Sequence, residues 1–297
     1  MLLSYSSSAC DGCNVYSPVG LINSRHKLSV FARQRTTYGA FSQLGEMITK
    51  HSGHANDPNI WGKSVLEHYQ TYEFRGDFYI KKKLQISVIL PFTNNIQKLD
   101  NKKRFSLFGL SDPTLMLGYS FFNDKEKSFK HRLTVISGAK IGIGLINLRS
   151  GGFIPNLDFQ PGTGAHSFLA GFNYSVKHKK WILNSVLNYK QNGFNAFNYK
   201  YGKTVNGRID LIKKVEIKNS DFMFLLGGYS EWAGLDESVI KHEDTGGTIL
   251  FANVGIKWLT NNFVTHLEYQ PVVSQNLNGT TQLLTKNRIN IGLTYVL

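Results

Sequence analysis

The sequence is poor in the charge that keeps soluble proteins in solution. Charged residues make up 18% of the 297-residue chain, below the roughly 25% that is typical of soluble domains. The chain also lacks a continuous apolar run near the roughly 18 residues that a membrane-spanning helix needs. The best apolar pieces are residues 141–146 and 222–228. These two shortages exclude a helical membrane protein and disfavour an ordinary soluble domain.

Cysteine and the common catalytic motifs are scarce as well. Structural zinc needs four ligands, so Cys10 and Cys13 favour a periplasmic disulfide over the alternatives, a lipid-modified or metal-binding cysteine. The nine histidines come with no Gly-x-Ser-x-Gly or His-Glu-x-x-His run. His51 and His54 have a spacing that could bind a metal, but two loop histidines are more often solvated. We therefore expect no enzyme, no metal and no cofactor, and no nucleotide-binding loop is present.

Aromatic residues and glycine are abundant, and they accompany a period of two. Aromatic residues make up 13% of the chain, and there are 28 glycines against 7 prolines. Apolar and polar residues alternate in many of the segments, as strands with one lipid-facing and one water-facing side require. The expected strands cover residues 26–41, 65–80, 83–98, 111–123, 131–146, 165–177, 181–194, 203–217, 221–235, 248–259, 263–277 and 286–297.

The connections between these segments alternate in length. Long ones at 42–64, 99–110 and 147–164 alternate with short ones at 81–82, 124–130 and 178–180. Outer-membrane barrels join their strands in this way, with short periplasmic turns and longer extracellular loops. The segments are also longer than the five or six residues usual in a soluble β-sandwich, which is the alternative. We predict an all-β protein, a closed antiparallel transmembrane β-barrel of about 12 strands with both termini at the short turns.

The net charge of +14 does not indicate a nucleic-acid partner. The lysines gather where the chain reverses direction and form no recognition helix. In a barrel these lysines would ring one rim, where they either attract anionic lipid head groups or only solubilise the turns. The clustered lysines are Lys81, Lys82, Lys83, Lys125, Lys127, Lys130, Lys177, Lys179, Lys180, Lys213, Lys214 and Lys218.

The polar phase of the expected strands carries an unusual number of charges. In an enclosed lumen charges persist only when they are paired or hydrated. The expected lumen and selectivity residues are Arg33, Arg35, Glu67, Glu73, Arg75, Asp77, Asp112, Lys140 and Glu268. By the same phase Arg208, Asp210, Glu231, Lys257 and His266 also face inward. We expect Arg33, Arg35, Glu73, Arg75 and Asp77 to form one network at mid-height, which acts as a selectivity element or as a plug.

Three motifs resemble those of outer-membrane barrels. The final residues, with Gly292, Tyr295 and Leu297, are similar to the C-terminal signal read by the outer-membrane insertion machinery, although that signal usually ends in Phe. Residues 109–119 resemble the Gly-x-Gly-Asp-Pro-x-Leu run of putative transporters of the phenol-degradation meta-pathway type, with Ser111 in place of the second Gly. Residues 9–13 resemble the Cys-Asp-x-Cys start of related barrels. The resemblance implies a barrel in the bacterial outer membrane.

The expected organisation is a residual targeting segment and periplasmic stretch at residues 1–25, followed by a barrel at 26–297. Small residues before Cys10 are typical of a signal-peptide cleavage site, but the stretch before them is short and uncharged. The expected function is a passive or gated channel or transporter for a small solute. The alternatives are a structural or plugged barrel without transport and a hydrolase at the membrane face. The expected partners are outer-membrane lipids, the insertion machinery and the solute.

Overall fold

The computed structural model describes residues 25–40, 64–80, 83–121, 128–217, 220–279 and 282–297. Within these residues the only helical element is one 3-10 turn, η4 (Leu157–Phe159), and no described helix is long or apolar enough to span a membrane. The strands are β1 (Lys27–Ala40), β2 (Ser64–Ile80), β3 (Leu84–Leu99), β4 (Lys102–Leu110), β5 (Thr114–Ser120), β6 (Phe129–Lys140), β7 (Ser167–His178), β8 (Trp181–Asn192), β9 (Thr204–Ile217), β10 (Ser220–Ala233), β11 (Asp236–Glu237), β12 (Lys241–His242), β13 (Gly247–Thr260), β14 (Phe263–Leu277) and β15 (Leu284–Val296).

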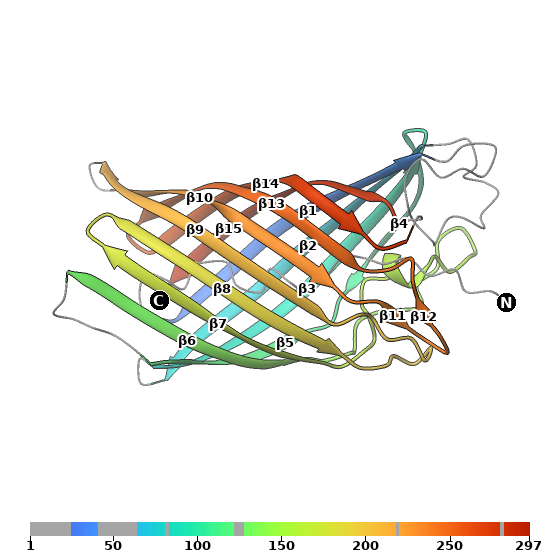
Figure 1. Cartoon of the computed structure of the whole chain (residues 1–297), viewed down its shortest axis with the longest axis horizontal. Helices are drawn as coiled ribbons and strands as arrows, with labels where there is room; N and C mark the ends of the chain where they lie inside the picture. Colours follow the sequence, from blue (N-terminus) through green and yellow to red (C-terminus); the bar gives the residue numbers. More distant parts are fainter. Residues whose placement is uncertain (1–24, 41–63, 81–82, 122–127, 218–219, 280–281) are drawn as a thin grey trace.

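The strands form one closed, tilted barrel (Figure 1). Thirteen strands belong to a single sheet in the order β2-β1-β15-β14-β13-β10-β9-β8-β7-β6-β5-β3-β4, and a further pairing of β2 with β3 closes it. Both β4 and β5 pair with β3, one with each half of it, so together they make one strand of the wall. The wall therefore has twelve strands, all antiparallel to their neighbours, and the predicted fold class is confirmed.

The fourth strand of the wall was placed wrongly from the sequence. Residues 99–110 were expected to form a long loop, but the chain reverses at Asp100 and Asn101, which have φ angles of 47° and 63°. Asp and Asn tolerate this left-handed conformation, which a tight two-residue hairpin requires. β4 then returns along the end of β3. The predicted alternation of long and short connections fails here because the turn is only two residues long. The charged start of β4 at Lys102 has the composition of a loop, so the sequence gives no sign of a strand there.

Side chains alternate between the two faces of the wall. In β2 the inward positions are buried, and the outward positions that are exposed carry apolar or aromatic side chains such as Phe74 and Phe78. The most exposed outward side chains include Leu226 at 64% and Ile209 at 60%. An apolar belt of this extent on a closed barrel faces lipid, because only a closed sheet satisfies its backbone groups inside a membrane. The inward face is polar and charged.

The two ends of the barrel differ. The tight connections at residues 179–180 and 261–262 lie at the end that we call the short-turn end, and β1 begins there. The C-terminus is fixed at the same end, because the Leu297 amide donates to the His26 carbonyl at 2.9 Å. The opposite, long-loop end carries the connections that include β11 and β12 (Figure 1). The C-terminal end was placed correctly, whereas residues 1–24 lie outside the described part of the chain.

Candidate functional site

The lumen is the candidate site, and the wall presents all nine predicted residues to it. Eight of them lie on the inward phase of their strands, and Asp112 is buried between β4 and β5. Glu67, Asp112 and Glu268 are almost fully enclosed, with exposures of 0%, 0% and 1%. Arg208, Asp210, Glu231, Lys257 and His266 are buried in the same way. The hydrogen bonds and ion pairs of these side chains fall into separate clusters.

Two ion pairs and one cation–π contact involve the five residues that were expected to form one network. Arg33 forms an ion pair with Glu73, and Arg75 Nη2 lies 2.9 Å from Asp77 Oδ1. The guanidinium of Arg35 lies over the Tyr69 ring at 4.5 Å. The strand register places Arg35 opposite Tyr69, and the single network of the five residues stays a prediction.

Neutral donors surround Glu67 at the long-loop end of β2. Its Oε2 accepts hydrogen bonds from Thr37 Oγ1 at 3.0 Å and from the Tyr69 hydroxyl at 2.9 Å, and its Oε1 accepts one from Gln97 Nε2 at 3.1 Å. These donors come from β1, β2 and β3. The carboxylate therefore ties three neighbouring strands together inside the barrel.

Two bidentate ion pairs reach over intervening strands. Arg208 on β9 donates to Glu268 on β14 at 2.9 and 2.8 Å. Arg288 on β15 donates to Glu231 on β10 at 2.5 Å through both nitrogens. Two strands lie between the partners in each case. Bidentate geometry holds both side chains in one orientation, so these pairs form fixed cross-links that narrow the lumen.

Gly227 leaves room for a contact between β9 and β13. It occupies the inward phase of β10 between β9 and β13, where a Cβ would lie 2.4 Å from Asp210 Oδ1. Asp210 instead accepts a hydrogen bond from Asn253 Nδ2 at 3.0 Å, over the glycine. The absence of a side chain at this position lets polar groups of β9 and β13 meet.

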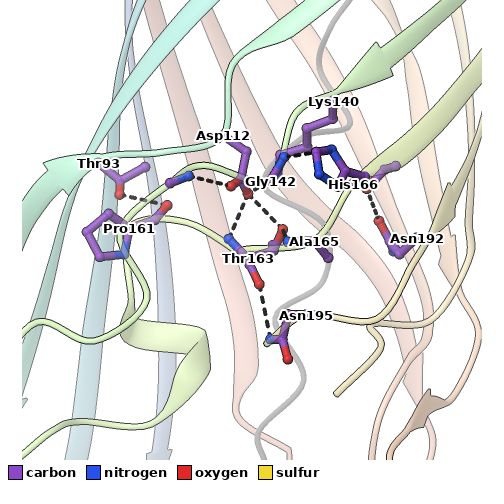
Figure 2. Close-up of polar contacts among 12 residues, drawn as sticks. Thr93, Asp112, Lys140, Gly142, Pro161, Thr163, Ala165, His166, Asn192 and Asn195 are labelled. Atoms are coloured by element: carbon purple, nitrogen blue, oxygen red, sulfur yellow. Dashed lines mark hydrogen bonds and ion pairs between the residues drawn. The ribbon is translucent and has the colours of Figure 1, made fainter. Parts of the chain in front are cut away.

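Asp112 accepts hydrogen bonds from backbone groups at the gap between β4 and β5 (Figure 2). Its Oδ1 accepts from the Gly144 amide at 2.9 Å, and its Oδ2 accepts from the amide and hydroxyl of Thr163, both at 2.7 Å. Lys140 Nζ lies 3.2 Å from Oδ2. The carboxylate therefore bonds to backbone groups where the chain departs from regular strand structure. This is the Asp of the transporter-like motif.

The connection between β6 and β7 folds into the barrel. Phe159 is 1% exposed and stacks on Tyr69 of β2 with ring centroids 5.5 Å apart. Asn95 of β3 donates to the Phe159 carbonyl at 3.0 Å, and Thr93 donates to the Pro161 carbonyl at 3.3 Å (Figure 2). Both β3 residues face inward, so this loop occupies the lumen at the long-loop end. The pattern of loop lengths indicates only an external loop there, and it gives no signal for the inward positions of Asp158 and Thr163.

Two small cavities lie in the lumen, the first of them beside the inserted loop. The first, of about 50 Å³, is lined by Asp158, Thr163, Tyr201 and Asp236 among others. The second, of about 40 Å³, is lined by Arg33, Glu73 and Thr71 among others. Both include Ser111, Lys140 and Lys190. The two cavities therefore share three lining residues, and the second lies at the level of the Arg33–Glu73 pair. Lys190 was not predicted, although the phase of β8 places it inward.

A polar cluster joins two loops above the first cavity. The Tyr199 hydroxyl donates to Asp236 Oδ2 at 2.5 Å and the Gly202 amide donates to Oδ1 at 2.6 Å. The Asp236 amide and Thr245 Oγ1 form a further bond of 2.8 Å. Burial raises the pKa of Asp236 to about 6, although the bonds from Tyr199 and Gly202 oppose that shift. Burial and the neighbouring carboxylate also raise the pKa of Tyr199.

The three residues of the predicted C-terminal signal lie in the described part of the chain. Gly292 gives room to the inward ring of Phe31, because a Cβ there would lie 2.3 Å from Phe31 Cδ1. Tyr295 faces outward and contacts Phe263, with centroids 5.1 Å apart, and Leu297 is exposed. The predicted cysteine and histidine pairs Cys10, Cys13, His51 and His54 lie outside the described residues.

No protein-family model matches the sequence, and comparison with curated proteins finds no relative. Comparison of structures finds the COG4313 outer membrane channel from Pseudomonas putida F1, with a TM-score of 0.65 and 12% identity over 98% of this chain and 100% of that one. The β domain of the Bordetella autotransporter BrkA gives a TM-score of 0.44 and 9% identity over 91% and 99% of the two chains. LpxR from Salmonella typhimurium gives 0.42 and 11% over 91% and 100%.

The first of these likenesses shows the fold of this chain. Its identity of 12% is too low to carry a substrate or a family membership to this protein. The closed barrel, its apolar outer belt and its polar interior place the chain in the bacterial outer membrane, as the sequence predicts. The phenol-degradation transporter type and the N-terminal cysteine motif remain predictions.

Proposed function

We propose that this barrel is an outer-membrane channel or transporter for a small solute, passive or gated, with a charged lumen. The observation that carries the proposal is a pair of cavities that share three lining residues, the first of them beside the inserted loop. They hold charged side chains from both sides of the lumen, and they reach the level of the Arg33–Glu73 ion pair. The solved outer membrane channel of the same fold supports the proposal without identifying a solute.

The size of the cavities limits the path. Volumes of about 50 and 40 Å³ accommodate a few water molecules each, since about 10–15 Å³ of such space holds one water. A solute larger than an ion therefore needs the inserted loop or the side chains to move. The Asp112 junction holds that loop through Thr163, so the proposed gate is the β6–β7 connection.

A structural barrel without transport is the second candidate, and the cross-linking ion pairs favour it. Arg288 with Glu231 and Arg208 with Glu268 both fill lumen space and fix strands that are not neighbours. In that case the interior charges serve only to hold the wall. The third candidate, a hydrolase at the membrane face, has no specific observation in its favour. The described residues contain no group of three or more His, Cys, Asp or Glu that could hold a metal.

Conductance of the purified protein in a planar bilayer tests the proposal. We expect discrete current steps. Arg288→Met should increase the conductance of each step, because it removes the cross-link to Glu231 with an uncharged side chain. Lys213→Met is the matched control, because Lys213 lies on the outer face over the Trp181 ring at 5.2 Å. A silent bilayer from protein that inserts normally would refute the channel and support the structural barrel.

We further propose that Gly292, Tyr295 and Leu297 form the signal for the insertion machinery. Tyr295 and Leu297 support this because their side chains lie on the outer, accessible face at the C-terminal end. Leu297→Asp should slow assembly by the purified machinery and leave the unfolding free energy of assembled barrel almost unchanged. Equal assembly rates for both proteins would overturn the proposal. Gly292 is a poor test residue because its substitution disturbs Phe31.

A further inference from the structure

Lys257 is a buried lysine without a counter-ion contact. It lies on β13, three residues before the strand ends at Thr260, and its exposure is 1%. Within the described part of the chain its ammonium has no hydrogen-bond or ion-pair partner. An enclosed charge without a partner is costly, because it loses hydration and gains no compensating contact. The position therefore calls for an anion or for ordered water.

The nearby carboxylates are already occupied. Glu268 binds Arg208 through two hydrogen bonds and also accepts from Gln270 Nε2 at 2.7 Å. Asp210 binds both Arg208 and Asn253. These contacts hold both carboxylates in place. Lys257 feels both negative charges from a distance, but it also feels the positive charge of Arg208.

His266 is the direct neighbour of Lys257 on β14, and it too has an unused group. The two residues are opposite each other in the β13–β14 register, and both face inward. His266 Nε2 lies 3.2 Å from Glu268 Oε2, so it carries the proton of that bond. His266 Nδ1 is buried and has no partner. In the neutral ring this nitrogen accepts a hydrogen bond, which a water or a solute hydroxyl can donate.

Other cations of the described chain, Lys27 and Arg132, also lie on the inward phase toward the short-turn end. At the rim Lys130 is directly opposite Lys177 in the β6–β7 register. Like charges at opposite positions are unfavourable unless an anion or water separates them. Asn184, with 0% exposure and neither amide atom bonded, adds a further unused polar group in this half.

We propose that Lys257 is the docking point for an anionic group, a carboxylate or a halide, in the short-turn half of the lumen. His266 Nδ1 holds the water or hydroxyl that accompanies this group. The site makes the lumen selective for anions. This inference rests on the proposed channel for its consequence in transport, but the binding site itself does not require conduction.

Binding is tested first, without any current. Crystals of the full barrel soaked in sodium bromide should show an anomalous peak within hydrogen-bond distance of Lys257 Nζ. The peak should be absent in Lys257→Met, a neutral side chain of similar length. Excess sodium acetate should displace the bromide if the site takes carboxylates, and should leave it if the site takes only halides. Bromide found solely at exposed rim lysines would overturn the site.

Selectivity is tested next by reversal potentials in gradients of potassium chloride and potassium acetate. We expect wild type to favour the anion, and Lys257→Met to lower the anion-to-cation permeability ratio about fivefold, as one charge at about 4 Å in water predicts. Lys213→Met removes the same charge from the lipid-facing side of the short-turn end and should change nothing. An equal effect of both substitutions, or of neither, would overturn the selectivity. A bromide peak in a barrel that never conducts would refute the channel and leave the site standing.

Discussion

The two halves of the lumen are built on different principles. In the long-loop half, the charged groups around Asp112, Glu67 and Glu231 are bonded to specific partners, and a loop is held among them. In the short-turn half Lys257 has no partner in the described chain and His266 Nδ1 is unused. Satisfied polar networks fix geometry, whereas unused polar groups bind water or ligand. Bonded groups occur in the short-turn half as well, at Asp77, and an unused atom occurs in the long-loop half, at Asn95 Oδ1. The halves therefore differ in the loop that the first holds and in the enclosed lysine of the second, and we propose that the first sets the shape of the path and the second sets its charge.

Removal of the Asp112 carboxylate should give the largest effect on this comparison. Asp112→Ala breaks three hydrogen bonds and leaves Lys140 buried without its carboxylate. We expect a loss of about 3–5 kcal/mol in unfolding free energy, measured by urea unfolding followed by tryptophan fluorescence. Asp221→Ala is the control, because its partly exposed pair with Lys214 should contribute no more than about 1 kcal/mol. Similar losses for both would show that the long-loop half is no better fixed than the rim.

The strand pattern was predictable from the sequence, because an inside–outside wall imposes a strict period of two. The phase also placed Glu67, Arg208 and Lys257 inward without any knowledge of the fold. The contact partners were not predictable, since they depend on register. Arg33 is opposite Thr71, and it meets Glu73 only diagonally.

The inserted loop was not predictable either. Phe159 and Asp158 belong to no periodic segment, and only the tertiary contacts of Phe159 with Tyr69 and Phe105 show that the loop lies inside. The charged start of β4 was read as a loop because Lys102, Lys103 and Arg104 are common in solvated segments. Local composition therefore failed where pairing with β3 decided the structure.

The loop cluster around Asp236 should weaken as the pH rises. Its pKa in the folded protein is about 6 against the usual 3.8, so the folded state favours the protonated acid. The resulting stabilisation is complete below about pH 4 and is lost as the pH passes through about 6; the shift of about two units corresponds to at most about 3 kcal/mol. Lys190 partly opposes the shift. Hydrogen exchange of the Gly202 amide, corrected for its intrinsic rate, should be slower at pH 4 than at pH 7.

Two variants separate Asp236 from its surroundings. Asp236→Asn cannot ionise and should abolish the pH dependence of the Gly202 amide. His242, whose pKa is lowered by burial, lies in the same loop, so His242→Gln should preserve the dependence. If Asp236→Asn retains the full dependence, another group controls the loops and the long-loop half is pH-sensitive for a different reason.

Substitution of one lysine in each half should change stability in opposite directions. Lys257→Met removes an enclosed charge without a partner, so we expect the free energy of unfolding to rise by about 1–3 kcal/mol. Lys140→Met removes the ion-pair partner of Asp112 and should reduce the free energy by a similar amount. Both proteins are measured by the same urea titration. A loss in both would contradict the view that the short-turn half retains an unpaired charge for binding.

Glu73→Gln should have the smallest effect on the fold and a specific effect on the path. The change keeps the size of the side chain and removes the carboxylate that pairs with Arg33 at the wall of the second cavity. If the path is open at this level, the freed Arg33 charge should shift selectivity toward anions about threefold, below the roughly fivefold that a full charge at about 4 Å predicts. If the pair closes the path, the same change should raise conductance instead.

Glu237→Gln, which removes a carboxylate from a loop ion pair with Lys200 at 3.2 Å, is the control and should alter neither quantity. Unchanged conductance and selectivity in Glu73→Gln would mean that this ion pair only holds β1 to β2, and the charge of the path would then be set by the short-turn half alone.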